Sequence, residues 1–289
     1  MFFRIADFLI EIGKIKKISA PFNLFQVKDN SEIPDIKISI EDNCTPCPKN
    51  KKLIFKTQNC WELHQWQNKI IFWDRFNGAK LSSDSRFAVF DKKLSRGKLH
   101  LYRSGVPHKS ALGRNPLSYP IGPLILLSKL SQRKEGIFLH ASGIKDSKGN
   151  GYIFCGHSGA GKSTMARLWS KNKKGTVLND DRLIIREKGE DFLAYGCPWY
   201  VRDKNLVSNV KIEVKKIFFL SHNPRNYLKP LTPKEAFLRV IRHAYFPFWD
   251  KSSVDASFGF LKKLCQKIDC FELGFRPTKK VINFIRQDT

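Results

Sequence analysis

Eight residues in the middle of the sequence have the types and the spacing of a phosphate-binding loop. They run Gly156-His157-Ser158-Gly159-Ala160-Gly161-Lys162-Ser163 and match the pattern G-x-x-x-x-G-K-[ST]. The glycines let the backbone take turns that a Cβ would resist, so that successive N–H groups and a helix N-terminus converge on phosphate oxygens. Lys162 would then reach the β- and γ-phosphates, and Ser163 would ligate Mg²⁺. We therefore expect ATP and Mg²⁺ as cofactors, with the nucleotide bound by Gly156, Ser158, Gly159, Ala160, Gly161, Lys162, Ser163 and Thr164.

Two adjacent aspartates follow this loop closely. Only 17 residues separate Lys162 from Asp180, which leaves room for one helix, one turn and one strand before the pair Asp180-Asp181. Adjacent side chains on an extended segment point to opposite faces, so we expect one carboxylate to meet the metal and the other a nucleophile or water. Upstream, His140 could hydrogen-bond to the base and tune it, or it could be a structural core histidine.

The elements around these residues follow from hydrophobic patterning. Residues 151–155 read as a buried strand before the loop, and residues 163–169 read as a helix after it. Residues 176–179 predict the short strand that delivers the acid pair. Residues 137–140 predict an earlier strand, and the turn at 145–151 predicts a hairpin into the strand before the loop.

The rest of the chain predicts a β-rich first part and further α/β elements after the acid pair. We expect a short amphipathic helix over residues 1–18, then β-type runs from residue 22 to residue 108. A helix from residue 124 to near residue 136 would follow. The later elements are a hairpin of 183–186 with 192–196, strands at 214–220 and 270–273, and helices at 233–244, 257–268 and 278–286. We place the domain boundary between a β-rich region, 1–115, and a nucleotide-binding domain, 116–289.

Composition narrows the class of protein. No stretch is apolar and long enough for a membrane span or a signal peptide, which predicts a cytoplasmic protein without a membrane partner. Seven cysteines indicate reduced thiols, and the C-x-x-C at 44–47 has no second pair at metal spacing. The net charge of +26 favours acidic partners, but it is spread along the chain, and no known RNA-binding motif accompanies it. These patterns argue against a nucleic-acid partner.

Several motifs together resemble the HPr kinase-like family. They are the run 139–143 (LHASG), the loop 156–164 (GHSGAGKST), the run 178–182 (LNDDR) and the tail 271–277 (FELGFRP). The resemblance covers roughly residues 120–285 and is nearest to the non-HPr kinases associated with peptide modification, such as lasso peptide kinases. It implies a phosphoenolpyruvate carboxykinase-like P-loop core, an α/β fold with a mixed β-sheet and flanking helices, preceded here by the smaller β-rich region.

The resemblance also implies roles for single residues. Asp180 matches the general base, Asp181 the metal-side acid and His140 the histidine beside the catalytic aspartate, while Lys162 and Ser163 match the phosphate and Mg²⁺ groups. The segment after Gly196 lacks the HPr-type residues of the phosphorylase reaction. Further residues, without an assigned role, are candidates for contact with phosphate or substrate: Arg182, Trp199, Tyr200, Arg202, Arg242 and His243.

We therefore expect an ATP-dependent serine kinase whose acceptor is a peptide or a small protein. Phosphoryl transfer needs cations on the migrating group and a carboxylate that accepts the hydroxyl proton, and the loop and the acid pair could supply both. Three other hypotheses stay open: an ATPase or regulatory module without phosphotransfer, a nucleic-acid-dependent ATPase, and a kinase directed at HPr itself. The sequence does not name the acceptor, and it leaves self-association open.

Overall fold

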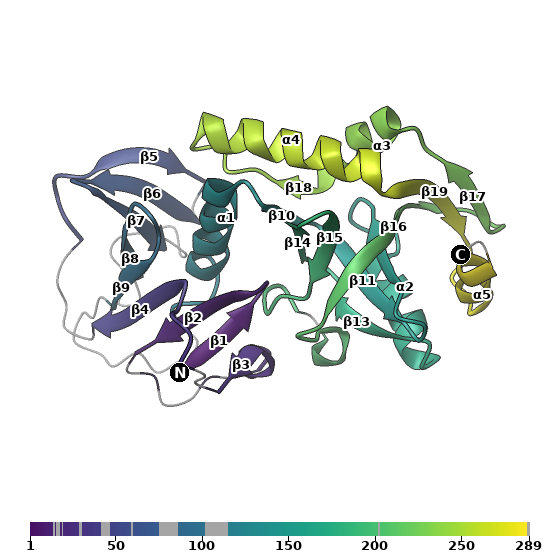
Figure 1. Cartoon of the computed structure of the whole chain (residues 1–289), viewed down its shortest axis with the longest axis horizontal. Helices are drawn as coiled ribbons and strands as arrows, with labels where there is room; N and C mark the ends of the chain where they lie inside the picture. Colours follow the sequence, from purple (N-terminus) through teal and green to yellow (C-terminus); the bar gives the residue numbers. More distant parts are fainter. Residues whose placement is uncertain are drawn as a thin grey trace. The chain divides into compact units, whose positions relative to one another are not determined.

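The computed structural model describes residues 1–13, 15, 18, 20–28, 31–41, 47–58, 60–74, 86–101, 115–201 and 203–287 (Figure 1). The chain divides into two compact units. Unit 1 contains residues 1–132 and 247–250, and unit 2 contains residues 133–246 and 251–289. Each unit is built around its own large sheet, and few helices accompany them, so the fold is mixed α/β.

Unit 1 is a nine-stranded mixed sheet. Its strand order is β3-β1-β2-β4-β9-β8-β7-β6-β5. The strands are β1 (Phe2–Ile5), β2 (Phe8–Ile12), β3 (Gln26–Val27), β4 (Ile36–Glu41), β5 (Lys52–Lys56), β6 (Trp61–Trp66), β7 (Lys69–Asp74), β8 (Arg86–Asp91) and β9 (Arg96–Leu101). This confirms the β-type runs predicted over these residues.

The helix predicted over residues 1–18 is wrong. β1 and β2 form an antiparallel hairpin instead, with Ile5 opposite Phe8. The turn consists of Ala6 and Asp7, whose φ angles are 50° and 62°. Two successive positive φ values match the twist of a tight hairpin, and neither residue type gives the usual Asn-Gly signal for it. Most of the apolar positions that suggested a helical stripe are buried, including the neighbours Leu9 and Ile10 on opposite faces of the hairpin.

The helix predicted from residue 124 is confirmed as α1 (Ile121–Arg133). Its Lys129 side chain is buried and donates hydrogen bonds from Nζ to the carbonyl oxygens of Lys93 (2.8 Å) and Leu94 (3.3 Å). These bonds tie α1 to the turn between β8 and β9 in unit 1. The division between the units therefore falls at residues 132/133, after this helix, whereas the boundary drawn from the sequence at 115/116 precedes it.

Unit 2 contains a ten-stranded mixed sheet and four α-helices within its described residues. The main strand order is β13-β11-β12-β16-β15-β14-β10-β18, with β19 beside β16 and β17 beside β19. The strands are β10 (Gly136–Leu139), β11 (Ala141–Asp146), β12 (Gly151–Cys155), β13 (Gly175–Asn179), β14 (Leu183–Lys188), β15 (Asp191–Tyr195), β16 (Lys211–His222), β17 (Tyr227–Pro230), β18 (Ala244–Tyr245) and β19 (Asp269–Phe275).

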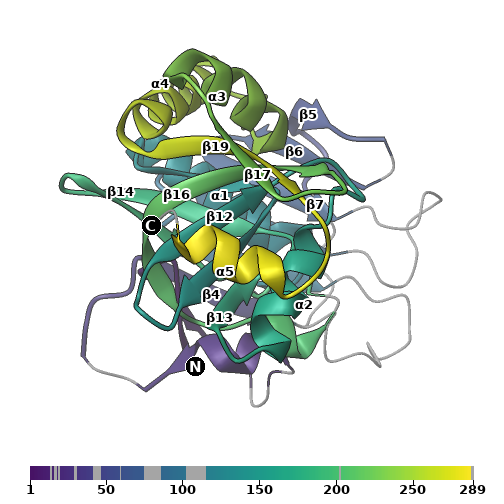
Figure 2. The same ribbon diagram turned by 90° about the vertical axis from the view of Figure 1, so that its right-hand side faces the viewer.

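Helices pack on both faces of this sheet. Ile153 and Cys155 of β12 face a core with α3 (Pro233–Val240) and α4 (Lys251–Lys267). Tyr152 and Phe154 of the same strand face the other core, with α2 (Lys162–Lys171) and α5 (Lys280–Gln287). Figure 2 shows α3 and α4 on one side of the sheet and α2 and α5 on the other. Because β12 is covered on both faces, it reads as a continuous apolar run.

Most elements predicted for unit 2 are confirmed, with shifts at their ends. α4 begins at Lys251, six residues before the predicted start, and α3 ends at Val240 and continues as a short 3₁₀ turn (Ile241–His243). The capping box of Thr232 and Glu235 sets the start of α3, since each satisfies a backbone N–H of the other. The sequence did not predict β17 or β18, both of which are short.

Candidate functional site

The register of three strands brings the loop, the acid pair and His140 to one edge of the sheet. β11 is antiparallel both to β12 and to β13, so β12 and β13 run in the same direction and end at the same edge. Ala141 lies opposite Cys155, and Gly143 lies opposite Asn179. The residues that follow Cys155 and Asn179, and the residue that precedes Ala141, therefore lie together. These are the glycine loop, Asp180 and His140.

The strand and the helix predicted on either side of the glycine loop are both confirmed. Gly161 is the N-cap of α2 with φ 102°, and an ideal Cβ placed on it would lie 2.6 Å from Cζ of Phe275. Only glycine therefore fits there. No side chain in the described part of the chain caps the start of α2. The N–H groups of the first turn, which lack intrahelical partners, remain available to an anion.

Lys162 lies over the loop. Its side chain is buried, with a relative exposure of 7%, and its Nζ donates hydrogen bonds to the carbonyl oxygens of Gly156 (2.8 Å) and His157 (3.1 Å). His222 contacts a different part of the loop, since its Nε2 lies 2.9 Å from the carbonyl oxygen of Gly159. The loop carbonyl oxygens thus bind the ammonium group, and a phosphate could replace them.

The two aspartates have different surroundings. Asp180 is 1% exposed, and neither of its carboxylate oxygens hydrogen-bonds to a residue that the structure describes. Asp181 is more exposed and lies near two basic groups: its Oδ1 is 3.5 Å from Nδ1 of His140 and its Oδ2 is 3.6 Å from Nε of Arg182. The resemblance placed His140 beside the catalytic aspartate, matched to Asp180. In the structure, His140 contacts Asp181.

Asn179 creates this difference. It is fully buried at the end of β13, and its Oδ1 accepts hydrogen bonds from the N–H groups of Asp181 (2.7 Å) and Arg182 (2.9 Å). Its Nδ2 donates to the carbonyl oxygens of Cys197 (2.8 Å) and Trp199 (3.3 Å). The chain therefore bends at the acid pair. The expectation from the sequence, an extended segment at this point, is wrong. The sequence did contain a signal for this bend. An asparagine directly precedes the acid pair, and Asn side chains often hydrogen-bond to the backbone two residues further along the chain.

β10 places His140 between two further segments. Leu139 lies opposite Leu183 of β14 and opposite Ala244 of β18. The N–H of His140 donates to the carbonyl oxygen of His243 (2.7 Å). Burial, together with the nearby ammonium group of Lys162, lowers the pKa of His140 and lowers the pKa of His243 to about 4. Both rings are thus neutral at pH 7, and Lys162 lies close to both.

Arg182 lies against two tyrosine rings. Its Cζ is 3.2 Å from the ring centroid of Tyr200 and 4.2 Å from that of Tyr245. Tyr200 has a φ of 60°, which is rare for a bulky residue and marks local strain. The sequence did not assign Tyr245 to the site, because its strand pairing with β10 spans more than 100 residues.

The other sequence candidates lie in different places. Trp199 is 2% exposed and packs against Phe138, so it belongs to the core. Arg242 is exposed at the surface near His243. Arg202 lies outside the described residues, as does Cys44 of the C-x-x-C.

The residues present fit a nucleotide with Mg²⁺. Over the described ranges no three His, Cys, Asp or Glu side chains form a metal site by themselves. Magnesium at nucleotide sites takes only one or two carboxylates and completes its shell with phosphates and water. The buried, unpartnered carboxylate of Asp180 would be costly without a cation or a proton donor nearby. Ser163 and Thr164 lie in the first turn of α2 and are half-buried.

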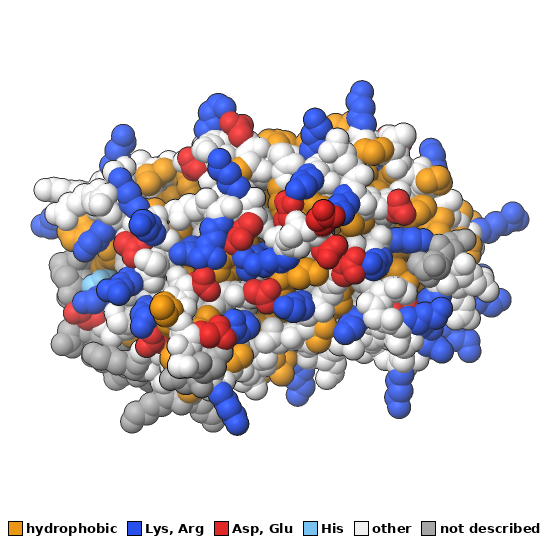
Figure 3. All heavy atoms as spheres, viewed as in Figure 1, with side chains coloured by type: hydrophobic (Ala, Val, Ile, Leu, Met, Phe, Trp, Pro, Cys, Tyr) orange, Lys and Arg blue, Asp and Glu red, His pale blue; other side chains and the backbone are white. Residues whose placement is uncertain are grey.

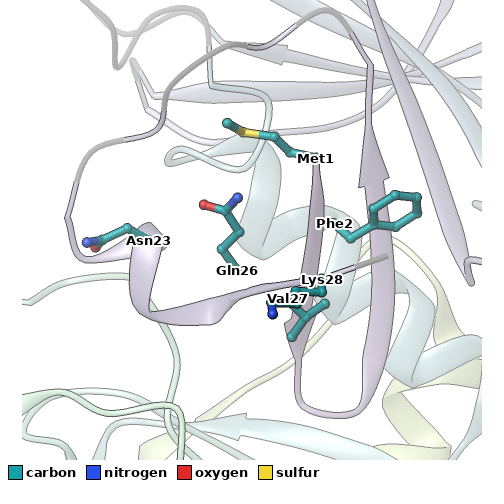
Figure 4. Close-up of a pocket in the computed structure, with 6 residues that line it drawn as sticks. All are labelled: Met1, Phe2, Asn23, Gln26, Val27 and Lys28. Atoms are coloured by element: carbon teal, nitrogen blue, oxygen red, sulfur yellow. The ribbon is translucent and has the colours of Figure 1, made fainter. Parts of the chain in front are cut away.

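Other surface features do not compete with this site. An open pocket in unit 1 is lined by Met1, Phe2, Asn23, Gln26, Val27 and Lys28 (Figure 4), and it brings together no group for catalysis. On the face drawn in Figure 3, lysines and arginines are interspersed with acidic and apolar side chains. No helix of the described residues is long and apolar enough to cross a membrane.

Comparisons with known proteins give a distant structural likeness only. No protein-family model matches the sequence, and no curated protein matches it. Among solved structures, the HPr(Ser) kinase/phosphatase from Coxiella burnetii is similar over 52% of this chain and 94% of that chain, with 10% sequence identity and a TM-score of 0.32. A likeness at this level does not show that the chain belongs to that protein's family.

Proposed function

We propose that unit 2 is an ATP-dependent kinase that transfers the γ-phosphate to a serine hydroxyl of a peptide or small protein. The observation that carries the proposal is the shared edge of the sheet. A glycine loop with a buried lysine and an uncapped helix start lies beside a buried carboxylate that has no hydrogen-bond partner in the described chain. The loop suits an anionic phosphate, and the carboxylate suits a proton or a cation.

The parts have distinct roles in this proposal. The N–H groups of the loop and Lys162 hold the phosphates and stabilise the charge that builds up on the transferred group. Asp180 accepts the proton of the acceptor hydroxyl. Asp181 and Ser163 would hold Mg²⁺, which would neutralise negative charge on the phosphates of the nucleotide. His140 contacts Asp181 and orients it.

The acceptor class is part of the same proposal. The resemblance to peptide-modifying kinases motivates a precursor or lasso peptide, and unit 1, with its β-rich sheet, is the proposed acceptor-recognising part. A net charge of +26 favours an acidic acceptor through long-range attraction.

The test is transfer of label from γ-labelled ATP to pools of serine-containing peptides in the presence of Mg²⁺. We expect labelled peptide with the wild-type chain and none with Lys162→Ala. Release of labelled inorganic phosphate without any labelled peptide or protein would contradict the kinase and would favour an ATPase or regulatory module.

A further inference from the structure

Aromatic rings pack against the planar guanidinium group of Arg182. The rings of Tyr200 and Tyr245 both contact it, at 3.2 and 4.2 Å from Cζ to ring centroid. Contacts of this kind between Arg and an aromatic ring are attractive, and the attraction grows when the pair is withdrawn from water. The two tyrosines come from segments far apart in the sequence, so the fold as a whole sets the position of this side chain.

The donors at the edge of the same group are left without acceptors. Nε is buried and makes no hydrogen bond to a described residue, since its nearest carboxylate oxygen, on Asp181, is 3.6 Å away. Within the described chain the terminal nitrogens of Arg182 also make no hydrogen bond, and the side chain is 17% exposed. A guanidinium carries five N–H donors in a rigid fork that matches a carboxylate or a phosphate. Arg182 is thus oriented, and beyond its ion pair with Asp181 its terminal N–H groups have no acceptor among the described residues.

Asn179 hydrogen-bonds to the backbone beside both Arg182 and Tyr200. Its Oδ1 accepts a hydrogen bond from the backbone N–H of Arg182, and its Nδ2 donates one to the carbonyl oxygen of Trp199, the residue before Tyr200. The positive φ of Tyr200 is strained and persists only where the surroundings enforce it. Such strain is common at ligand-binding positions.

Arg182 and the phosphate loop are carried by different strands of the sheet. The loop follows β12, whereas Arg182 directly precedes β14, and β16 and β15 lie between these two strands in the sheet order. In the sequence, Arg182 adjoins the acid pair. An anion bound there would lie beside the acid pair.

We propose that Arg182 binds a carboxylate of the acceptor and selects peptides with an acidic residue next to the phosphorylated serine. The proposal rests on the kinase proposed above, which places the acceptor at Asp180. An oxyanion at Arg182 could also come from the nucleotide, and the experiment separates the two sources.

The experiment compares two dye-labelled heptapeptide pools with a central serine that is flanked on both sides by Glu in one pool and by Gln in the other. Binding is measured by fluorescence anisotropy at physiological salt with a non-hydrolysable ATP analogue and Mg²⁺. We expect the wild-type chain to bind the Glu pool at least about tenfold more tightly. Arg182→Gln should reduce the preference to less than about twofold, and Arg182→Lys should give an intermediate value, because Lys lacks the planar fork.

The matched control is Arg167→Gln, which removes one exposed positive charge from α2. It should keep the full preference. A wild-type chain without preference, a preference that survives in Arg182→Gln, or an equal loss in Arg167→Gln would each overturn the proposal. So would a tenfold loss of affinity for the ATP analogue in Arg182→Gln, which would assign the guanidinium to the nucleotide.

Label transfer from γ-labelled ATP to the same pools separates this inference from the proposed function. A Glu preference in binding without any transfer would contradict the kinase and leave the anion site standing. Transfer to both pools without preference would contradict the anion site alone.

Discussion

Replacement of Asn179 by alanine should destabilise unit 2 and disorganise its site. The side chain is fully buried and makes four hydrogen bonds to backbone N–H and carbonyl groups, three between 2.7 and 2.9 Å and one of 3.3 Å, and a longer one of 3.9 Å to Sγ of Cys197. A hydrogen bond contributes about 1 kcal/mol net, and partners left buried and unpaired add to the loss. We therefore expect the free energy of unfolding to fall by about 3 kcal/mol or more. For a unit of about 150 residues this lowers the melting temperature by roughly 6–12 °C.

Thermal unfolding followed by circular dichroism measures this effect. Asn226→Ala is the matched control, because Asn226 is only half-buried and accepts one hydrogen bond, from the N–H of Arg276. Its melting temperature should change by a few degrees at most. An Asn179→Ala variant that melts like the wild-type chain would refute the reasoning that this side chain holds the acid pair and the Cys197–Trp199 segment together.

Two further predictions concern the loop and pH. Gly161→Ala should weaken the binding of a fluorescent ATP analogue by tenfold or more, because Gly161 has a φ of 102° and a Cβ there would collide with Phe275. The control is Gly259→Ala on α4, where a Cβ meets no described atom within 4 Å, and this variant should bind the analogue normally. Equal binding by both variants would contradict this view of the loop. Burial lowers the pKa of His243 to about 4 from its ordinary value of 6.5, so the stability that its neutral ring provides is complete above pH 6.5 and is lost as the pH falls toward 4. We expect the melting temperature of the wild-type chain to fall over this range more steeply than that of His243→Gln, and parallel curves would contradict the assignment.

The loop and its flanking elements could be predicted from the sequence because their signals are local. A short apolar run, three closely spaced glycines and a Lys-Ser pair at a helix start all fall within residues 151–169. The first 18 residues show where local signals fail. Their apolar spacing suits one face of a helix, but it also suits a hairpin buried on both faces, and the turn at Ala6 and Asp7 lacks the Asn-Gly or Asp-Gly pair typical of a two-residue hairpin.

The finer geometry of the site could not be predicted, because it depends on pairing between distant segments. His140 meets the backbone of His243, and Arg182 meets Tyr245, only because β10 pairs with both β14 and β18. No periodicity in the sequence encodes which strand becomes the neighbour of another. The assumption that the acid pair is extended failed for a related reason, since the bend depends on hydrogen bonds from Asn179 to the distant Cys197 and Trp199.

The most direct test of the central claim compares Asp180→Asn with the wild-type chain in two assays on the same preparation. One assay measures the affinity for an ATP analogue with Mg²⁺, and the other measures label transfer from γ-labelled ATP to serine peptides. We predict that the variant binds the analogue within about threefold of the wild-type chain and loses transfer by at least about a hundredfold, since general-base catalysis contributes at least that much. Transfer at the wild-type rate by Asp180→Asn would contradict this claim.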